Sequence, residues 1–136
     1  MTALTADRTT LARDGKDRCL PVAANVTIYC GALVMLNVAG TVQPASATVG
    51  MIAVGVAQEA AHNAQGTAGA ITVPVRRGAF CFQNSTGGDA ITAAAIGQQC
   101  YAVDDQTVAL TNGSNSRSVA GHVFDVTVDG VWVDIQ

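Results

Sequence analysis

The side chains best suited to acid–base chemistry in this chain are one glutamate and two histidines, Glu59, His62 and His122. General acid–base catalysis needs titratable groups held as a positioned pair. Glu59 and His62 lie three residues apart, but the surrounding VAQEAAHNAQGTAG has too little helical character to put them on one helix face. We therefore interpret both as surface residues and His122 as a hydrogen-bonded structural histidine. The sequence predicts that the protein is not an enzyme.

The cysteines do not have the spacing of a metal site. The intervals between them contain 10, 50 and 18 residues, so no Cys-x-x-Cys pair is present. A structural zinc site usually draws on such close pairs, and a disulfide requires an oxidising compartment. We therefore expect four buried thiols that pack as small hydrophobic groups. They are Cys19, Cys30, Cys81 and Cys100.

Motifs for cations, phosphates and nucleophilic serines are also missing. Asp104 and Asp105 lack the alternating acids and closing glutamate of a calcium loop and are interpreted as turn formers. The segment NSTGGD has no phosphate-loop lysine, and no Gly-x-Ser-x-Gly occurs. The sequence thus predicts no catalytic residue, no cofactor and no metal. Convergence of distant residues into an enzyme site, or a barrel that binds a small molecule, stays open as an alternative.

Size and composition favour one β-rich domain with a weakly charged surface. The chain has 136 residues, of which 12% are charged, and a net charge of −3. A partner often covers such a surface, although a weakly charged monomer is the alternative. The sequence has no strong basic patch, which argues against binding of nucleic acid. No apolar run is long enough to span a membrane. The N-terminus lacks the pattern of a signal peptide, so we expect synthesis in the cytoplasm.

Residues 1–18 form a distinct segment that predicts an extended N-terminal arm. They contain four of the seven basic residues, three aspartates and no helical or strand periodicity. Leu4 and Leu11 are the large apolar residues after Met1. Such a segment is typically disordered alone and ordered on a partner. The basic residues are Arg8, Arg13, Lys16 and Arg18.

Residues 19–136 show about eight to ten short β-type runs at the spacing of a sandwich or barrel. Turn formers separate these runs, and Asp129-Gly130 is the strongest hairpin signal. One short helix is predicted in DAITAAAIG, with Asp89 capping its start and Gly97 its end. The other predicted elements are strands at 26–29, 32–36 and 51–60, an Ala39-Gly40 hairpin, and hairpins turning at 104–106 and 129–130.

The stretch TVPVRRGAFCF breaks its own alternation. A bulge at Arg76-Arg77-Gly78 would return two phenylalanines to the side of Val73 and Val75. Pro74 cannot donate a ladder hydrogen bond, which predicts that the strand is an edge at that point. The arginines are interpreted as edge protection with surface ion pairs. Contact with acidic groups on another protein chain, or a phosphate or nucleic-acid site, are the alternatives.

The order of these motifs resembles a known group of proteins. The arm, PVAANVTIYCGALVML, VGVAQEA, VPVRRGAFCF, IGQQCYAVDDQTVAL and AGHVFDVTVDGVWVDI are together similar to minor capsid proteins of tailed bacteriophages. These are the cement or decoration proteins of Mu-like phages and prophages. The resemblance covers most of residues 19–136 and includes no residue-level contact motif.

The resemblance implies a structural virion protein that binds the outside of the phage head and stabilises the lattice of the major capsid protein. Such proteins are commonly homotrimers on the capsid surface, assembled in the host bacterial cytoplasm, with no direct contact to nucleic acid or membrane. A tail or head–tail connector protein is the alternative. The candidate residues for binding the capsid are Leu4, Arg8, Leu11, Arg13, Arg76 and Arg77.

The expected fold is therefore mainly β. We expect a single small β-sandwich or β-barrel-like domain, β-tulip-like, with one short helix and an extended N-terminal arm. The expected organisation is an arm at 1–18 and a β-rich capsid-binding domain at 19–136.

Overall fold

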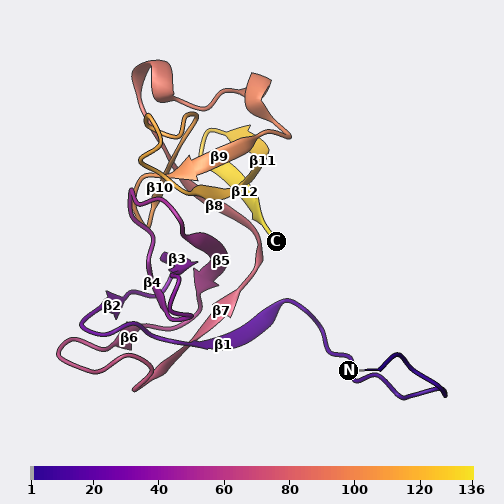
Figure 1. Ribbon diagram of the computed structural model, residues 1–136. Coiled ribbons are helices and arrows are strands. Elements are labelled where there is room, and N and C mark those ends of the chain that lie inside the picture. Colours follow the sequence, from indigo (N-terminus) through magenta and orange to yellow (C-terminus); the bar gives the residue numbers. More distant parts are fainter. Residues whose placement is uncertain (1) are drawn as a thin grey trace.

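The structure, a computed structural model, describes residues 2–136 and is built almost entirely from short strands (Figure 1). This confirms the mainly β fold with a barrel-like sheet. In chain order the elements are β1 (Asp17–Pro21), β2 (Thr27–Ile28), β3 (Leu33–Leu36), β4 (Val42–Pro44), β5 (Ile52–Ala57), β6 (Ala61–His62), β7 (Thr72–Arg76), β8 (Gly78–Asn84), η1 (Gly87–Asp89), η2 (Ala93–Ala95), β9 (Gln99–Ala102), β10 (Thr107–Ala109), β11 (Val119–Thr127) and β12 (Gly130–Ile135).

The first half of the chain folds into an antiparallel sheet with the strand order β1-β7-β5-β3-β4. The chain continues from β1 to Val22, which forms a parallel bridge with Val42 in β4. The two ends of the sheet therefore approach each other, and the sheet curls around a core of its own. That core contains Val22, Ile28, Ala32, Val34, Val42, Val54, Ala57, Ala61, Val73 and Val75.

The second half closes into a five-stranded barrel with the order β10-β8-β12-β11-β9. Its interior is not separate from the sheet, because Leu33, Met35 and Val56 reach the same buried cluster from β3 and β5. β3 and β5 thus carry side chains into both cores, because their residues Val34 and Val54 point into the sheet core. This shared layer makes one continuous domain of sheet and barrel.

The stretch TVPVRRGAFCF is a crossing between the two layers, and not one bulged strand. β7 belongs to the sheet and β8 to the barrel, with Arg77 between them. Val73 and Val75 are buried in the sheet core, whereas Phe82 is buried in the barrel core. The prediction that the two valines and the two phenylalanines point inward is therefore correct. The valines face the sheet core, however, and the phenylalanines face the barrel core. Gly78 takes φ +146° at the crossing, which suits glycine.

β7 as a whole is not an edge, because β1 and β5 pair with it on its two sides, but its pairing with β5 ends at Val75, just before Pro74. Pro74 fits here because the β5–β7 ladder ends at the Ala57–Val75 pair. β5 has ended at Ala57, and the Gln58 N–H donates to the Pro74 carbonyl at 2.9 Å. The missing Pro74 N–H therefore leaves no partner strand unsatisfied.

β5 comes unusually close to β7 at Gly55. Its φ is +139°, and a Cβ placed on it would overlap the carbonyl of Arg76. Glycine suits this position, because a side chain there would meet the backbone of β7.

The short helical element, predicted to have one or two turns, is present as two single 3-10 turns, η1 and η2, and η1 begins two residues before the predicted segment. Asn84 explains the break between them, because its side chain binds both the N–H and the carbonyl of Ile91 at 2.8 Å. Those backbone groups are therefore not available to a helix. Asp89 does not cap a helix either, because its carboxylate binds Thr111 and Arg117.

The arm extends away from the rest of the molecule (Figure 1). Residues 2–16 contain no helix or strand, and every residue from 2 to 19 is exposed. β1 begins at Asp17, so the last two residues of the predicted arm belong to the sheet.

Candidate interaction site at the arm root

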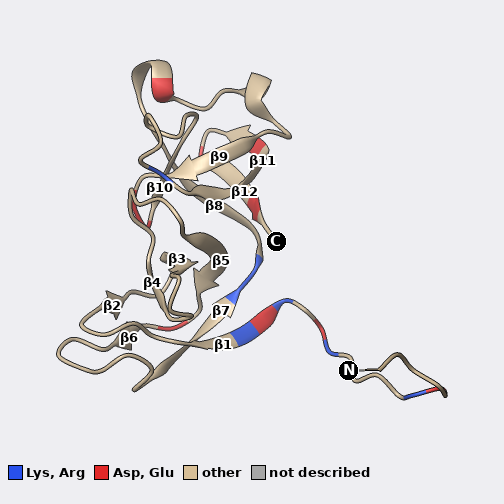
Figure 2. Cartoon of the chain, in the orientation of Figure 1, with Lys and Arg blue, Asp and Glu red and all other residues tan. Residues whose placement is uncertain are grey.

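The arm joins the sheet where β1 pairs with β7, and basic and acidic positions follow one another along the chain there (Figure 2). We call this region the arm root. It comprises Lys16, Asp17, Arg18, Arg76 and Arg77.

Asp17 and Arg76 form an ion pair across the two strands. The register places them opposite each other, and the Arg76 Nε donates to the Asp17 Oδ1 at 2.8 Å. This hydrogen bond holds the pKa of Asp17 below its usual range and raises the pKa of Arg76. Both side chains are about half exposed, at 58% and 50%. The pair therefore neutralises Asp17 without contributing much to stability. The predicted surface ion pair of Arg76 is confirmed.

Arg77 has a different environment. Its N–H donates to the Lys16 carbonyl at 3.0 Å, and its guanidinium lies over Gly15. Among residues 2–136 it forms no ion pair, so the surface ion pair predicted for Arg77 is wrong. Arg77 and Lys16 line a shallow depression of about 280 Å³, and Asp134 is also among its lining residues. The charge of Arg77 is therefore presented to solvent.

Charge is segregated along the molecule. Six of the seven basic residues lie in residues 1–18 or at Arg76 and Arg77, and the seventh is Arg117. Seven of the ten acidic residues lie outside residues 1–18, in the body of the protein. Since Arg76 is paired with Asp17, the other charged residues of the arm root are all basic. This arrangement favours an acidic partner.

The candidate residues predicted from sequence fall into two places. Arg76 and Arg77 lie at the arm root, whereas Leu4 and Arg8 line one bend of the distal arm. Leu4 and Leu11 are exposed by 70% and 93%. The structure does not bring all the candidates together: they lie along an extended segment. Arg13 is also exposed in this segment.

Sequence reasoning missed Lys16, Asp17 and Arg18 as site residues. It counted two of them as basic residues of the arm, but DRCLP has charges and a proline and did not predict a strand. The signal that could have indicated this strand is the spacing of Leu20 and Val22. They lie two residues apart and both point toward the sheet core. That signal is too short to identify a strand by itself.

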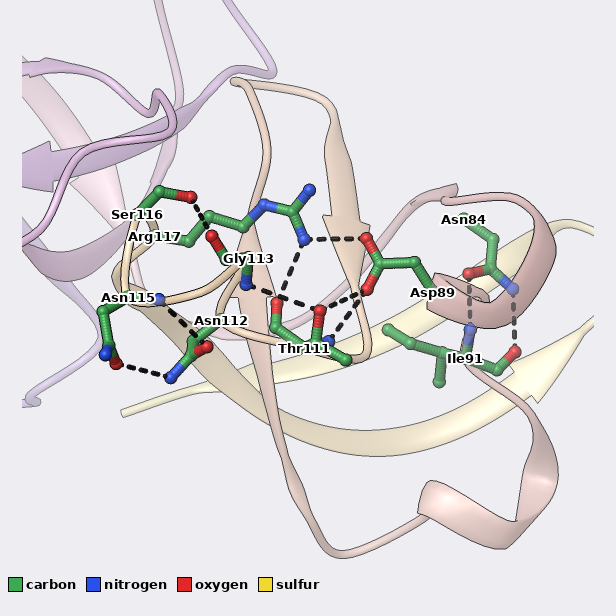
Figure 3. Close-up of polar contacts among 9 residues, drawn as sticks. All are labelled: Asn84, Asp89, Ile91, Thr111, Asn112, Gly113, Asn115, Ser116 and Arg117. Atoms are coloured by element: carbon green, nitrogen blue, oxygen red, sulfur yellow. Dashed lines mark hydrogen bonds and ion pairs between the residues drawn. The ribbon is translucent and has the colours of Figure 1, made fainter.

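A second polar cluster lies at the far end of the barrel and joins two loops (Figure 3). Asp89 accepts hydrogen bonds from the Thr111 hydroxyl at 2.7 Å and from Arg117 Nη1 at 2.7 Å. Thr111 is the largest cause of the lowered pKa of Asp89, followed by Arg117. The Arg117 side chain is 17% exposed and also donates to the Thr111 carbonyl. These groups satisfy one another, so the cluster ties the loops together and leaves little for a ligand.

The prediction of four buried thiols is confirmed for Cys100, holds only in part for Cys81, and is wrong for the other two cysteines. Cys19 and Cys30 are exposed, Cys81 is intermediate and Cys100 is buried. Burial raises the pKa of Cys100 to about 12, and burial followed by the charge of Asp129 raises that of Cys81. The two inner cysteines therefore pack as small hydrophobic groups, whereas the outer two face solvent.

The titratable residues of the acid–base prediction do not gather in one site. His122 is exposed and its side chain makes no hydrogen bond within residues 2–136, so its interpretation as a hydrogen-bonded structural histidine is wrong. It lines an apolar groove of about 290 Å³ between β5 and the ends of β11 and β12, which also contains Asp134. Glu59 and His62 are exposed elsewhere, and His62 stacks edge-on with Tyr29 at 6.4 Å.

Two further observations concern classes of partner. Within residues 2–136 no group of three or more His, Cys, Asp or Glu side chains is placed to hold a metal ion. No described helix has the length and apolar character needed to cross a bilayer.

Comparison of the chain with protein-family models, curated proteins and solved structures gives no match.

Proposed function

We propose that this chain is a structural virion protein of a tailed bacteriophage. In this role it binds the outside of the head and stabilises the lattice of the major capsid protein as a cement or decoration subunit. The sequence resemblance suggests this class, and the arm supports it.

The observation that carries the proposal is the contrast between arm and body. Residues 2–19 are exposed throughout, and they include Leu4, Leu11 and a series of cations. The body buries its apolar residues in two cores without using the arm. An exposed segment that does not support the fold, yet carries anchoring side chains, is suited to ordering on another surface.

The geometry supports a cement role through repetition. Each subunit would make a few modest contacts through the arm and the arm root. Many such contacts over a shell add up, because each bound subunit links neighbouring capsid proteins and raises their effective local concentration. A homotrimer would strengthen this effect by presenting several arms at once. Exposed apolar residues on the barrel, including Phe124 and Val128, are candidates for contacts between copies.

The test is to heat phage heads with and without the protein and measure DNA release. Heads that carry the protein should release DNA at a higher temperature. Equal release temperatures would contradict the cement role. Locating the protein in whole virions by cryo-microscopy separates the head role from the alternative of a tail or connector protein.

A further inference from the structure

We infer that the outer edge of β1 is a strand-addition site for an acidic, extended segment of the shell protein. This inference rests on the proposed function and specifies how the arm root contacts its partner. It concerns backbone hydrogen bonds as well as side-chain charges.

The register of β1 shows which backbone groups are available. The Lys16 carbonyl accepts from Arg77, and the Val22 N–H donates to the Ile71 carbonyl, both at 3.0 Å. In an antiparallel pair, every second residue bonds to the same neighbour. Residues 16, 18, 20 and 22 therefore bond toward β7, and the backbone groups of Asp17 and Cys19 point away from it.

No strand among residues 2–136 occupies that outer side. β1 stands at one end of the strand order and pairs with β7 alone. The opposite end of the sheet is partly covered, because the Ala23 N–H donates to the Val42 carbonyl at 2.8 Å. The barrel is closed. The β1 edge is thus a row of backbone donors and acceptors that an extended chain can pair with.

Charge decides which chain fits. Asp17 is already neutralised by Arg76, so the cations Lys16 and Arg18 dominate the edge. Pairing with β1 of a second copy would place like charges side by side, which is unfavourable. An acidic strand avoids this repulsion and gains attraction.

The alternation of side chains adds a more specific expectation. Lys16 and Arg18 are two residues apart and therefore lie on one face of the strand. The added segment should carry Asp or Glu at alternate positions opposite them. Pairing should end at Pro21, which has no N–H to donate.

A proline substitution separates strand addition from contacts made by side chains alone. The Cys19 N–H is not used by β7, so Cys19→Pro removes an outward donor and places its ring where the added strand would lie. Cys19→Ala is the matched control, because it changes the side chain and keeps the N–H. Both variants should retain the fold, which the melting temperature checks.

The measurement is binding of wild-type protein and both variants to phage heads that lack it. Cys19→Ala should bind as the wild type does, and Cys19→Pro should bind about tenfold or more weakly, as expected for lost backbone pairing. Equal binding of Cys19→Pro and wild type would overturn the inference. If Cys19→Pro does not fold, amide exchange decides: binding should slow exchange at Cys19 in the wild type, and unchanged exchange would overturn the inference.

The proposed function and the inference fail in different ways. Wild-type protein that does not bind heads contradicts the proposed function. The edge is then tested with a synthetic peptide alternating Glu and Thr, against one alternating Lys and Thr. Slowed exchange at Cys19 with the Glu peptide alone supports the inference, and exchange unchanged by either peptide overturns it.

Discussion

The molecule contains two aspartate–arginine pairs, and their surroundings differ. Asp17–Arg76 lies at the arm root, where both side chains are about half exposed. Asp89–Arg117 lies at the far end of the barrel, where the side chains are exposed by 26% and 17%. Thr111 completes the second pair with its hydroxyl and its carbonyl. The first pair adjusts the charge of a surface, whereas the second holds two loops together.

The difference extends to the backbone around each pair. The barrel end belongs to a closed set of strands, while the arm root lies beside the open edge of β1. The proposed interaction surface and the partly buried Asp89–Arg117 pair thus lie at opposite ends of the molecule. Substitutions at the barrel end should therefore alter stability, and substitutions at the arm root should alter binding.

The largest expected effect is on binding, after removal of residues 2–14, which keeps the Lys16 carbonyl that accepts from Arg77. Because these residues are exposed, the melting temperature should stay the same. Binding to phage heads should fall by about 100-fold or more, since several anchoring side chains are lost together. Titration of heads with the shortened protein measures this effect.

A full-length variant controls for the loss of chain length. Leu4→Ser with Leu11→Ser should weaken binding, whereas Thr9→Ser with Thr10→Ser should not. A shortened protein that binds heads as the wild type does would place the interaction on the body of the molecule.

The next effect is on stability, and it separates the two ion pairs. Asp89→Ala should lower the free energy of unfolding by about 1–3 kcal/mol, because Arg117 and Thr111 lose a partner in a partly buried site. Asp17→Ala should give no measurable change, because its pair is exposed. Denaturant unfolding measures both. Equal losses in the two variants would remove the distinction between the two ends of the molecule.

Much of the fold was predictable because its signals are local. The alternation in Val131–Ile135 and the Asp129-Gly130 turn predicted the hairpin of β11 and β12, and the structure confirms it. The hairpin of β9 and β10 is confirmed in the same way. Within β11, however, the register shifts between Val123 and Asp125. Nothing in the local alternation indicates where such a bulge falls.

The candidate site was only partly predictable, because its geometry depends on distant pairing. The cations of the arm were evident from composition, and Arg76 and Arg77 from their place in a strand. The strand β1 was not, since it forms by pairing with β7, and Asp17 lies 59 residues before Arg76. Strand formation of this kind depends on tertiary context more than on intrinsic preference.

The smallest expected effect is on the pH dependence of stability, and it tests the two aspartates in the same experiment. The pKa of each is lowered in the folded protein, with Arg76 as the first cause at Asp17 and Thr111 at Asp89. An aspartate whose folded pKa is lowered stabilises the fold above its unfolded pKa of about 3.9, and this contribution is lost as the pH falls through the folded pKa. Stability should therefore decline below about pH 4.

Asparagine variants assign that decline to its source. Asp89→Asn should flatten the melting temperature below about pH 4 more than Asp17→Asn does, because the Asp89 carboxylate is less exposed. Raising the salt concentration from about 0.05 M to about 1 M should remove the contribution of Asp17 and leave most of that of Asp89, since salt screens exposed pairs more strongly. If salt removed both contributions equally, the Asp89 cluster would be as open to solvent as the arm root, and the barrel end would be a second surface available to a partner.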